Sequence, residues 1–398
     1  MRRIEYPAYV EEALSRLCAA GEEAYLVGGS LRDALLGLDA HDFDVATSAL
    51  PEITLGVFSD CRVIETGIKH GTVTVILQGT PVEITTFRRD GDYTDGRHPD
   101  TVSFTDRITE DLSRRDFTVN AMAYHPDRGL VDPFDGQSDL KTRTLRAVRE
   151  PHLRFDEDAL RILRAFRFAA QLGFSIEPAT LVAAADCREG LARIARERVA
   201  SEFIRLLCSP DAARAILLME QTGVLSYVVG GFVPSTRALE ALEHMPAEDT
   251  ARLGTFFFGA SAEEISAVLH DLRCSTRQIR GTLAVARGAG TCVACDRDAT
   301  ALRAEVGEYA ATAVRLSELL SISPEGAAAR VAHNDAPTAI ADLSITGKDL
   351  MACGLSGREI GQMLSYLLGV VMTEPAYNNK EALLALCKER IREGHRKS

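Results

Sequence analysis

Two aspartates, Asp42 and Asp44, are separated by one residue in the segment DFDVAT (42–47). The segment predicts a strand, on which positions i and i+2 point to the same face. Adjacent carboxylates repel each other, so a cation between them stabilises the pair. Hard oxygen ligands favour Mg²⁺, which keeps positions for water and for substrate phosphates. A lone D-x-D pair also occurs in ordinary polar loops, so the pair alone leaves both interpretations open.

A third carboxylate, Glu83, stands between apolar residues in PVEITTF (81–87), which also predicts a strand. An acid on an otherwise buried strand needs a partner, because burying an unpaired charge is costly. A metal ion shared with Asp42 and Asp44 would supply that partner.

The dipeptide Gly28-Gly29 stands between a short predicted strand, EAYLV (23–27), and a short predicted helix that Ser30 can cap. The backbone can approach a triphosphate closely there, and the N–H groups at a helix start favour anions. Arg32 lies in the first turn of that helix, where it could reach a phosphate oxygen.

The segment EDLSRRDFTVNAMA (110–123) carries a second group of charged residues. Arg114 and Arg115 could bind a phosphate or a nucleobase, with Asp116 and Asn120 holding them in place. An exposed charged turn before a helix is the alternative interpretation.

The segment LRFDEDALRILRAFRF (153–168) predicts one amphipathic helix. On it a charged stripe winds beside an apolar one, with charges at Asp158, Arg161, Arg164 and Arg167. Salt pairs on an exposed face would also explain such a stripe.

An Asp–Arg pair could, however, select a nucleobase. A carboxylate only accepts hydrogen bonds and a guanidinium only donates them. Cytosine and adenine present an amino donor beside a ring-nitrogen acceptor, whereas guanine and uracil present a carbonyl oxygen in place of the amino group. Asp158 and Arg161 could therefore admit C and A and reject G and U, at a cost of about 1–3 kcal/mol per wrong contact.

These segments resemble the nucleotidyltransferase superfamily of DNA polymerase β. LVGGSLRDALLG (26–37) with DFDVAT is similar to the first motif of class II tRNA nucleotidyltransferases, the CCA-adding enzymes, and of their bacterial poly(A) polymerase relatives. RRDFTVNA (114–121) is similar to the second motif. Glu157, Asp158 and Arg161 match the E-D-x-x-R motif to which base selection is assigned.

The resemblance implies a role for each residue. Catalysis would fall to Asp42, Asp44 and Glu83, with Mg²⁺ as cofactor on the two aspartates. The nucleotide would bind to Gly28, Gly29, Arg32, Arg115, Asp158, Arg161, Arg164 and Arg167.

Two further roles concern residues in and beside these motifs. Arg115 is preferred to Arg114 as the nucleotide contact. In ARERVASEFIRLL (195–207), Glu197 and Arg198 could brace the pair formed by Asp158 and Arg161.

The implied reaction is the Mg²⁺-dependent addition of C, C and A to the 3′ end of tRNA from CTP and ATP, with release of pyrophosphate. Poly(A) addition, CC-only or A-only addition, and a catalytically dead RNA-binding module are the alternatives. The loop at 88–104 looks full-length, which favours complete CCA addition. The chain ends soon after Lys397, which argues against a poly(A) polymerase with a basic extension.

The order of the strands and helices that must position these residues predicts an α+β head with a small mixed sheet, followed by an all-α remainder. The resemblance implies that the head is similar to that of DNA polymerase β. We expect the head at 1–140, a helical neck that recognises the base at 141–210, a helical body at 211–295 and a helical tail that binds tRNA at 296–398. Residues 88–104 predict a long loop, and such loops are usually functional.

The composition fits an ordinary globular protein: 398 residues, 46% hydrophobic and 26% charged, with a formal net charge of −12. The acidic balance argues at first against nucleic acid as a partner. Basic residues are concentrated locally, however, and residues 141–170 carry a net charge of +4. This favours a narrow RNA-binding track.

No apolar run is long enough to span a membrane, and the N-terminus lacks the apolar stretch of a signal peptide. We therefore expect a cytoplasmic protein with no membrane partner. A monomer and a homodimer both stay open, because the sequence does not determine the oligomeric state. The nine cysteines predict free thiols. Cys292 and Cys295 lack the further ligands of a zinc site, and His270-Asp271 lacks those of a phosphohydrolase.

Overall fold

The structure is a computed structural model that describes residues 4–40, 42–91 and 102–397. It divides into two compact units, Met1–Gly231 and Phe232–Ser398. The boundaries expected at 140, 210 and 295 are not tested by this division and stay predictions.

The first unit contains a mixed sheet whose described strands follow the order β3-β4-β5-β2-β1-β8-β9. Only β2 and β5 are parallel neighbours within it; the other adjacent pairs are antiparallel. The strands are β1 Ala24–Val27, β2 Asp44–Thr47, β3 Arg62–Ile64, β4 Thr72–Leu77, β5 Thr80–Thr86, β8 Ala123–His125 and β9 Gly129–Val131. The expected small mixed sheet is thus confirmed.

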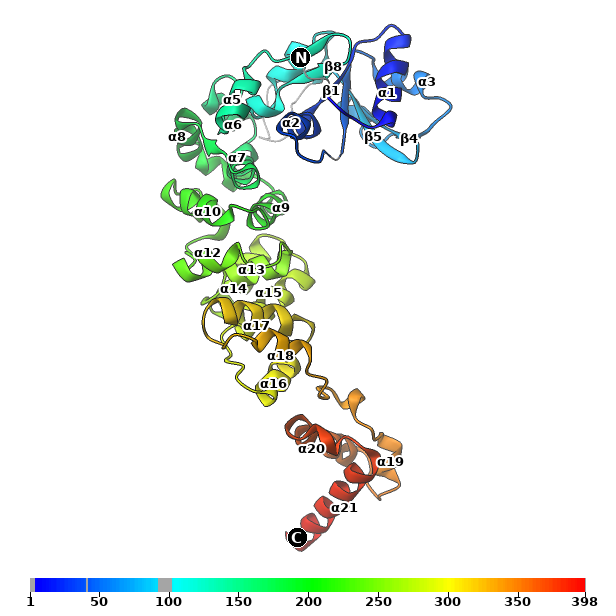
Figure 1. The fold of residues 1–398 in the computed structure, drawn as a ribbon, viewed down its shortest axis with the longest axis vertical. Coiled ribbons are helices and arrows are strands. Elements are labelled where there is room, and N and C mark those ends of the chain that lie inside the picture. Colours follow the sequence, from blue (N-terminus) through cyan, green and yellow to red (C-terminus); the bar gives the residue numbers. More distant parts are fainter. Residues whose placement is uncertain (1–3, 41, 92–101, 398) are drawn as a thin grey trace. The chain divides into compact units, whose positions relative to one another are not determined.

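Helices α1 and α3 contact the central strands of this sheet (Figure 1). In α1 the buried residues Val10, Ala13, Leu14 and Leu17 recur at helical spacing. The short helices of this part are α1 Ala8–Ala19, α2 Gly28–Leu36, α3 Pro51–Val57, η1 Ile68–His70, α4 Ile108–Ser113, η2 Thr118–Asn120 and α5 Gly136–Thr142.

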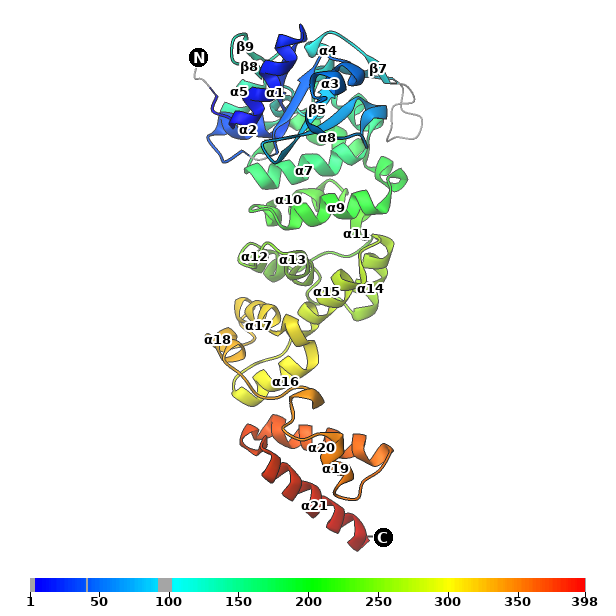
Figure 2. The same ribbon diagram turned by 90° about the vertical axis from the view of Figure 1, so that its right-hand side faces the viewer.

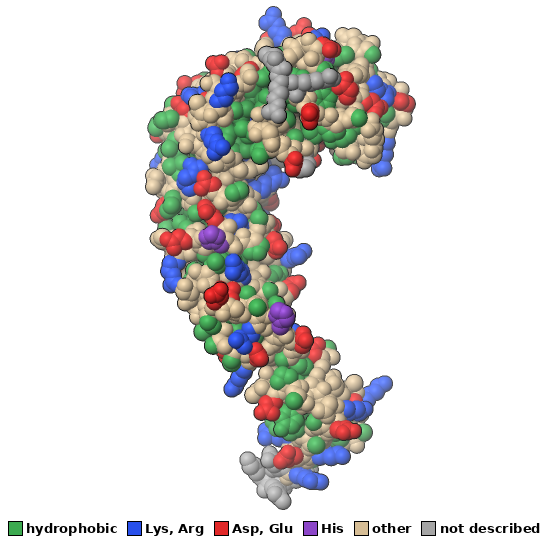
Figure 3. All heavy atoms as spheres, viewed as in Figure 1, with side chains coloured by type: hydrophobic (Ala, Val, Ile, Leu, Met, Phe, Trp, Pro, Cys, Tyr) green, Lys and Arg blue, Asp and Glu red, His purple; other side chains and the backbone are tan. Residues whose placement is uncertain are grey.

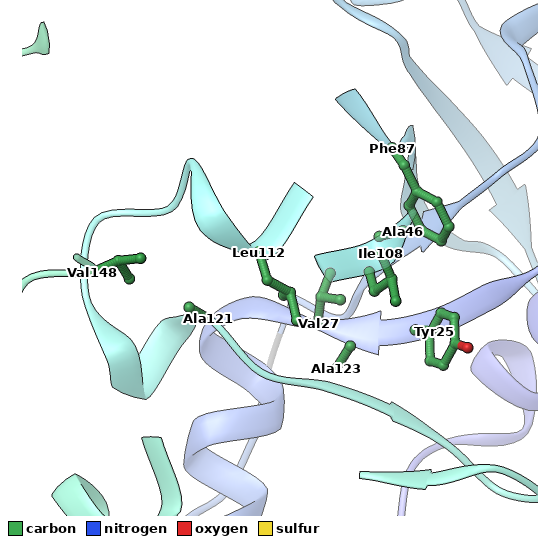
Figure 4. Packing of buried hydrophobic residues seen from close by; sticks show 9 residues of the cluster. All are labelled: Tyr25, Val27, Ala46, Phe87, Ile108, Leu112, Ala121, Ala123 and Val148. Atoms are coloured by element: carbon green, nitrogen blue, oxygen red, sulfur yellow. The ribbon is translucent and has the colours of Figure 1, made fainter. Parts of the chain in front are cut away.

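Helix α4 packs on the sheet through an apolar cluster. Ile108 and Leu112 of α4 lie with Tyr25 and Val27 of β1 in this cluster, and Ala46 of β2 belongs to it (Figure 4). Ala46 and Asp44 share a face of β2 because they are two residues apart. The cluster therefore fixes the strand that carries Asp44.

Three local expectations in this part are wrong. Helix α2 begins at Gly28 rather than after Ser30. Asp42 precedes β2 and has a φ of 52°, so the two aspartates do not share a strand. Glu83 lies on β5 but is exposed, because Val82 and Ile84 turn to the buried face and Glu83 to the open one.

The loop expected at 88–104 is paired at its ends, where β6 Arg88–Asp90 and β7 Val102–Phe104 form an antiparallel ribbon. Residues 92–101, which include most of the expected long loop, lie outside the described residues.

Helices then replace the sheet, as expected (Figure 2). Helix α7 packs against α9 and α10, and α6 packs against α8. The elements are β10 Thr144–Leu145, α6 Pro151–Glu157, α7 Leu160–Leu172, β11 Ser175–Ile176, α8 Pro178–Asp186, η3 Arg188–Arg193, α9 Arg196–Leu207, α10 Ala212–Gln221 and α11 Leu225–Val229.

The single helix expected over 153–168 is broken. Asp158 has an extended backbone between α6 and α7. Its carboxylate accepts a hydrogen bond from the Leu160 backbone N–H at 3.0 Å, which satisfies a free donor at the start of α7. A residue that caps a helix in this way cannot also continue the preceding one.

The second unit is all-helical in its described residues. Its elements are α12 Thr236–Leu242, α13 Asp249–Phe256, α14 Ala262–Asp271, α15 Thr276–Gly288, α16 Asp296–Val306, η4 Gly307–Tyr309, α17 Ala310–Leu319, α18 Ala327–Ala332, η5 Ile340–Asp342, α19 Gly347–Met351, α20 Arg358–Thr373, η6 Pro375–Tyr377 and α21 Lys380–Lys397. Lys and Arg side chains are interspersed with Asp and Glu on the face shown in Figure 3.

Candidate active site

A pocket of about 580 Å³ in the first unit brings most of the predicted residues together. Nine of the eleven predicted site residues line it; Asp42 and Glu83 do not. Its charged lining consists of seven arginines and three aspartates: Arg32, Arg114, Arg115, Arg161, Arg164, Arg167, Arg198, Asp44, Asp116 and Asp158. Such a concave, strongly basic surface suits a polyanionic ligand.

Asp44 opens β2 at one wall of this pocket. Its Cα pairs in register with that of Glu83 on the parallel neighbour β5. Burial and then the carboxylate of Glu83 raise the pKa of Asp44 from 3.8 to about 6, with Arg115 opposing them and Asp42 adding to them. The negative charge at Asp44 is thus under-compensated by the protein's own groups.

The carboxylates can be tested against a metal ion. Among the described residues, no three His, Cys, Asp or Glu side chains lie close enough together to hold a metal by themselves. Two carboxylates with substrate phosphates and water are nevertheless a usual Mg²⁺ environment. The unbalanced charge at Asp44 fits such an ion, and the assignment of Asp42 and Asp44 as metal ligands stays a prediction.

The backbone at Gly28 requires glycine for two reasons. Its φ is +80°, which L-residues rarely adopt. A Cβ there would lie 3.2 Å from Asp44 Oδ2 and 3.6 Å from Arg115 Nη1. At Gly29 a Cβ would be in ordinary contact, 3.5 Å from Arg32 Nη2. Gly28 therefore lets the start of α2 approach the charged wall closely.

Arg115 is held beside Asp44 by a carboxylate that the sequence interpretation missed. Asp111 is buried and accepts hydrogen bonds from Arg114 Nη2 at 2.8 Å and from Arg115 Nη2 at 3.3 Å. Spacings of three and four residues on α4 and its C-terminal end could have revealed these pairs. Although burial opposes it, the charges of Arg114 and Arg115 lower the pKa of Asp111.

Asp116 and Asn120 hold arginines, as expected, but not their predicted partners Arg114 and Arg115. Asp116 Oδ2 accepts from Arg164 Nε at 2.8 Å and from Arg164 Nη2 at 2.6 Å. Asn120 Oδ1 accepts from Arg32 Nη1 at 2.7 Å. Although burial opposes it, the charge and the hydrogen bonds of Arg164 lower the pKa of Asp116 to about 2.

Asp158 and Arg161 both line the pocket but do not pair with each other. Asp158 Oδ2 accepts from Arg198 Nη2 at 2.8 Å, so the expected bracing by Arg198 is present at the level of geometry. Arg161 instead donates to Glu157 and, at 3.1 Å, to the Arg114 backbone carbonyl. The break at Asp158 separates the two residues that a continuous helix would have kept on one stripe.

Arg167 pairs with Glu202, a residue of α9. The sequence interpretation did not identify Glu202 as a site residue. Arg167 Nε donates to Glu202 Oε2 at 2.6 Å, and both side chains are nearly buried. Burial lowers the pKa of Arg167, with Glu202 opposing and Arg164 adding to the shift. The 35-residue separation of this pair left no local signal.

Two buried donors in the pocket have no hydrogen-bond partner among the described residues, Arg115 Nε and Arg198 Nη1. Buried polar groups are nearly always paired, so these two N–H groups mark where a ligand would supply acceptors. Arg115 lies near Gly28, where the phosphates are expected, and Arg198 donates to Asp158, where the base is expected.

Within the described part of the chain, no helix is both long and apolar enough to cross a membrane.

Two family models match parts of this chain. Residues 24–146 match a model described as the poly A polymerase head domain, and 173–237 match one described as a probable RNA and SrmB-binding site of polymerase A.

A CCA-adding enzyme of Levilactobacillus brevis is 37% identical over 92% of this chain and 94% of its own length. Another, from Lacticaseibacillus paracasei, is 51% identical over 54% of this chain and 53% of its length, so that match spans about half of each. The crystal structure of the Bacillus stearothermophilus CCA-adding enzyme in complex with CTP covers 98% of both chains, at 29% identity and a TM-score of 0.85. With this fold and this pocket, the chain belongs to the family of CCA-adding enzymes, which are nucleotidyltransferases with a polymerase-β-like head.

Proposed function

We propose that this chain adds C, C and A to the 3′ end of tRNA from CTP and ATP, releasing pyrophosphate. The observation that carries the proposal is the pocket, in which Gly28 and Asp44 of the head face the arginines of α7. The family membership and the CTP complex of the Bacillus stearothermophilus enzyme support it.

The family implies a divalent metal ion, and we propose Mg²⁺. Asp42 and Asp44 would hold it, with Glu83 supporting Asp44 from the adjacent strand. When bound, the ion would activate the attacking hydroxyl and stabilise charge on the leaving group.

The chain's own residues would orient the nucleotide for in-line attack of the tRNA 3′ hydroxyl on the α-phosphate. Gly28 and Gly29 would expose backbone N–H groups to the triphosphate, and Arg32 and Arg115 would donate to its oxygens. Positioning and charge stabilisation supply most of the catalysis in phosphoryl transfer, so no covalent enzyme intermediate is required.

Base selection would use Asp158 and Arg161 as separate residues of the pocket rather than as one preformed pair. Asp158 accepts two hydrogen bonds, one from Leu160 and one from Arg198, and a carboxylate can accept about four. Arg161 likewise keeps spare donors beyond its hydrogen bonds to Glu157 and to the backbone carbonyls of Arg154 and Arg114. An amino group of C or A would meet the free acceptors of Asp158, whereas a carbonyl oxygen would face like charge.

A product gel tests the proposal. A tRNA lacking its last three nucleotides is incubated with CTP and ATP, together and separately. We expect a fixed three-nucleotide extension with both nucleotides. A long ladder with ATP alone would indicate poly(A) addition, the activity named by the matched head model. Extension by two nucleotides or one would indicate a CC-only or A-only enzyme, and no extension a dead RNA-binding module.

We further propose a cytoplasmic location. All nine cysteines are free thiols in the structure, which suits a reducing compartment.

A further inference from the structure

The ring of Phe168 is surrounded by three arginines that come from two parts of the first unit. The guanidinium carbons of Arg167, Arg164 and Arg32 lie 3.9, 5.1 and 5.2 Å from its centroid. Phe168 follows Arg167 on α7 and lines the pocket, while Arg32 belongs to α2. Each distance is within the range at which a cation is attracted to an aromatic face.

Each of these arginines already donates a hydrogen bond to a carboxylate of the protein. Arg164 donates to Asp116 and Arg167 to Glu202. Arg32 donates to Asp33 from Nε at 2.8 Å and to Asn120 from Nη1 at 2.7 Å, and Arg167 also donates to Gln171 at 3.0 Å. A guanidinium has five N–H donors, so each of the three still has donors beyond these contacts.

Three like charges around one point repel each other, and carboxylates behind them offset only part of that repulsion. The electron-rich faces of Phe168 attract each of the three guanidiniums, which offsets a further part of the repulsion. The ring itself is anchored by an edge contact with Phe117 of the head, with centroids 5.9 Å apart. Phe168 thus joins α7 to the head at the point where the three cations meet.

We propose that Phe168 is a positioning residue that holds Arg32, Arg164 and Arg167 as one binding site for the triphosphate of the incoming nucleotide. This rests on the proposed function, because it names how that same pocket holds its substrate. Arg32 lies beside Gly29, so the site is continuous with the backbone expected to contact phosphate. Direct stacking of a base on Phe168 is disfavoured, because Arg167 already covers a face at 3.9 Å.

The first experiment measures binding of inorganic tripolyphosphate and of cytidine by calorimetry, which requires no nucleotidyl transfer. Phe168→Leu should weaken tripolyphosphate binding about ten-fold, since three weak cation–ring contacts are lost. Phe168→Tyr, which keeps the ring, should bind nearly as well as the wild type. Cytidine binding should be unchanged in both variants.

Phe166→Leu is the matched control, because Phe166 is a fully buried ring on the same helix that does not line the pocket. It should lower stability without weakening tripolyphosphate binding. An equal loss in both leucine variants would show that Phe168 only stabilises α7. A loss of cytidine binding in Phe168→Leu alone would show instead that the ring stacks a base.

If Phe168→Leu fails to fold, replacement of Phe168 by mono-, di- and pentafluorophenylalanine keeps its shape while weakening the negative face of the ring. Tripolyphosphate affinity should fall stepwise along this series, and KM for CTP and for ATP should rise in parallel with little change in kcat. A flat series would overturn the proposal, even if the product gel confirmed CCA addition. If no CCA addition were seen in the product gel but tripolyphosphate affinity still fell stepwise, the proposed function would be overturned and the proposed anion site would stand.

Discussion

Asp44 and Asp116 are both aspartates that line the same pocket, yet their surroundings shift their pKa values in opposite directions. At the sheet edge, burial and the nearby Glu83 raise the pKa of Asp44 to about 6. Beside α7, the Arg164 guanidinium overcomes burial and lowers the pKa of Asp116 to about 2. Burial acts in the same direction on both carboxyl groups. The two pKa values part because Arg164 outweighs burial at Asp116, whereas Arg115 does not outweigh burial and Glu83 at Asp44.

The difference separates two kinds of residue. Asp116 already has its cation, so its main effect is to fix Arg164 and stabilise the fold. Asp44 lacks a full counter-charge within the protein, so it is available to a cation that arrives with the substrate. Perturbed carboxylates that destabilise the empty fold are typical of functional sites.

The largest expected effect is on catalysis at the sheet edge. Asp44→Asn should lower the rate of nucleotide addition about 10³-fold or more, since a metal ligand contributes several kcal/mol of transition-state stabilisation. The measurement is single-turnover incorporation of labelled CTP with saturating Mg²⁺. Substantial residual activity in an Asp42→Ala, Asp44→Ala double variant would refute the metal assignment.

The same substitution should stabilise the metal-free fold. Because the pKa of Asp44 is raised, its contribution to stability is greatest below about pH 4 and is lost as the pH rises through about 6. At pH 7, Asp44→Asn should therefore raise the free energy of unfolding by about 2–3 kcal/mol. Urea denaturation in a chelator measures it, and Mg²⁺ should reduce the difference.

Asp116→Asn should act with the opposite sign. Because the pKa of Asp116 is lowered, its contribution is present above about pH 4 and is lost as the pH falls through about 2. At pH 7 the free energy of unfolding should fall by about 2 kcal/mol. Asp211→Asn is the control, because Asp211 pairs with Arg214 in a half-exposed position and should contribute little. A change of the same sign at Asp44 and Asp116 would break the comparison.

Arg161→Ala should relax base selection on the α7 side of the pocket. Incorporation of G and U relative to C and A should rise about 10- to 100-fold, which is the discrimination that one bidentate contact to a base supplies. Competition assays with all four nucleotides measure it. Arg205→Ala, an exposed arginine on α9 outside the pocket, should leave selectivity unchanged. Unchanged selectivity in Arg161→Ala would sink the base-selection hypothesis.

The smallest expected effects are those of substitutions at Gly28 and Gly29, at the start of α2 beside Asp44. Gly28→Ala should cost about 1–2 kcal/mol of stability, because its φ is positive and the new Cβ would press on Asp44. It should also raise KM for CTP. Gly29→Ala meets only an ordinary contact and should change stability far less. Thermal unfolding of both variants distinguishes the two glycines, which the sequence alone treats as equivalent.

Several features of the fold could be predicted from short segments because their signals are local. Alternation in β4 and β5 predicts a hairpin, and the positive φ of Gln78 and Gly79 shows how its two-residue turn is made. The amphipathic face of α1 and the change from sheet to helices were likewise visible. The expected helix over 153–168 failed because hydrophobic spacing does not reveal a side chain that caps a helix start.

The partners of the site residues could not be predicted in this way. Glu202 reaches Arg167 across 35 residues of chain, and Arg198 reaches Asp158 across 40. Such pairs depend on which helices pack together, and helical spacing within one segment carries no signal of it. Asp111, three and four residues before its arginines, and Glu157, four residues before Arg161, lay within reach of local reasoning.

The sequence by itself determined the chemistry available: two glycines, three carboxylates and a row of arginines in the order of a nucleotidyltransferase. The tertiary structure decided how that chemistry is divided. The parallel register of β2 and β5 sets Glu83 beside Asp44, and the packing of α7 on the head sets Arg164 beside Asp116. The physical reason is that charge interactions act through space, so a residue's state depends on neighbours that only folding brings near.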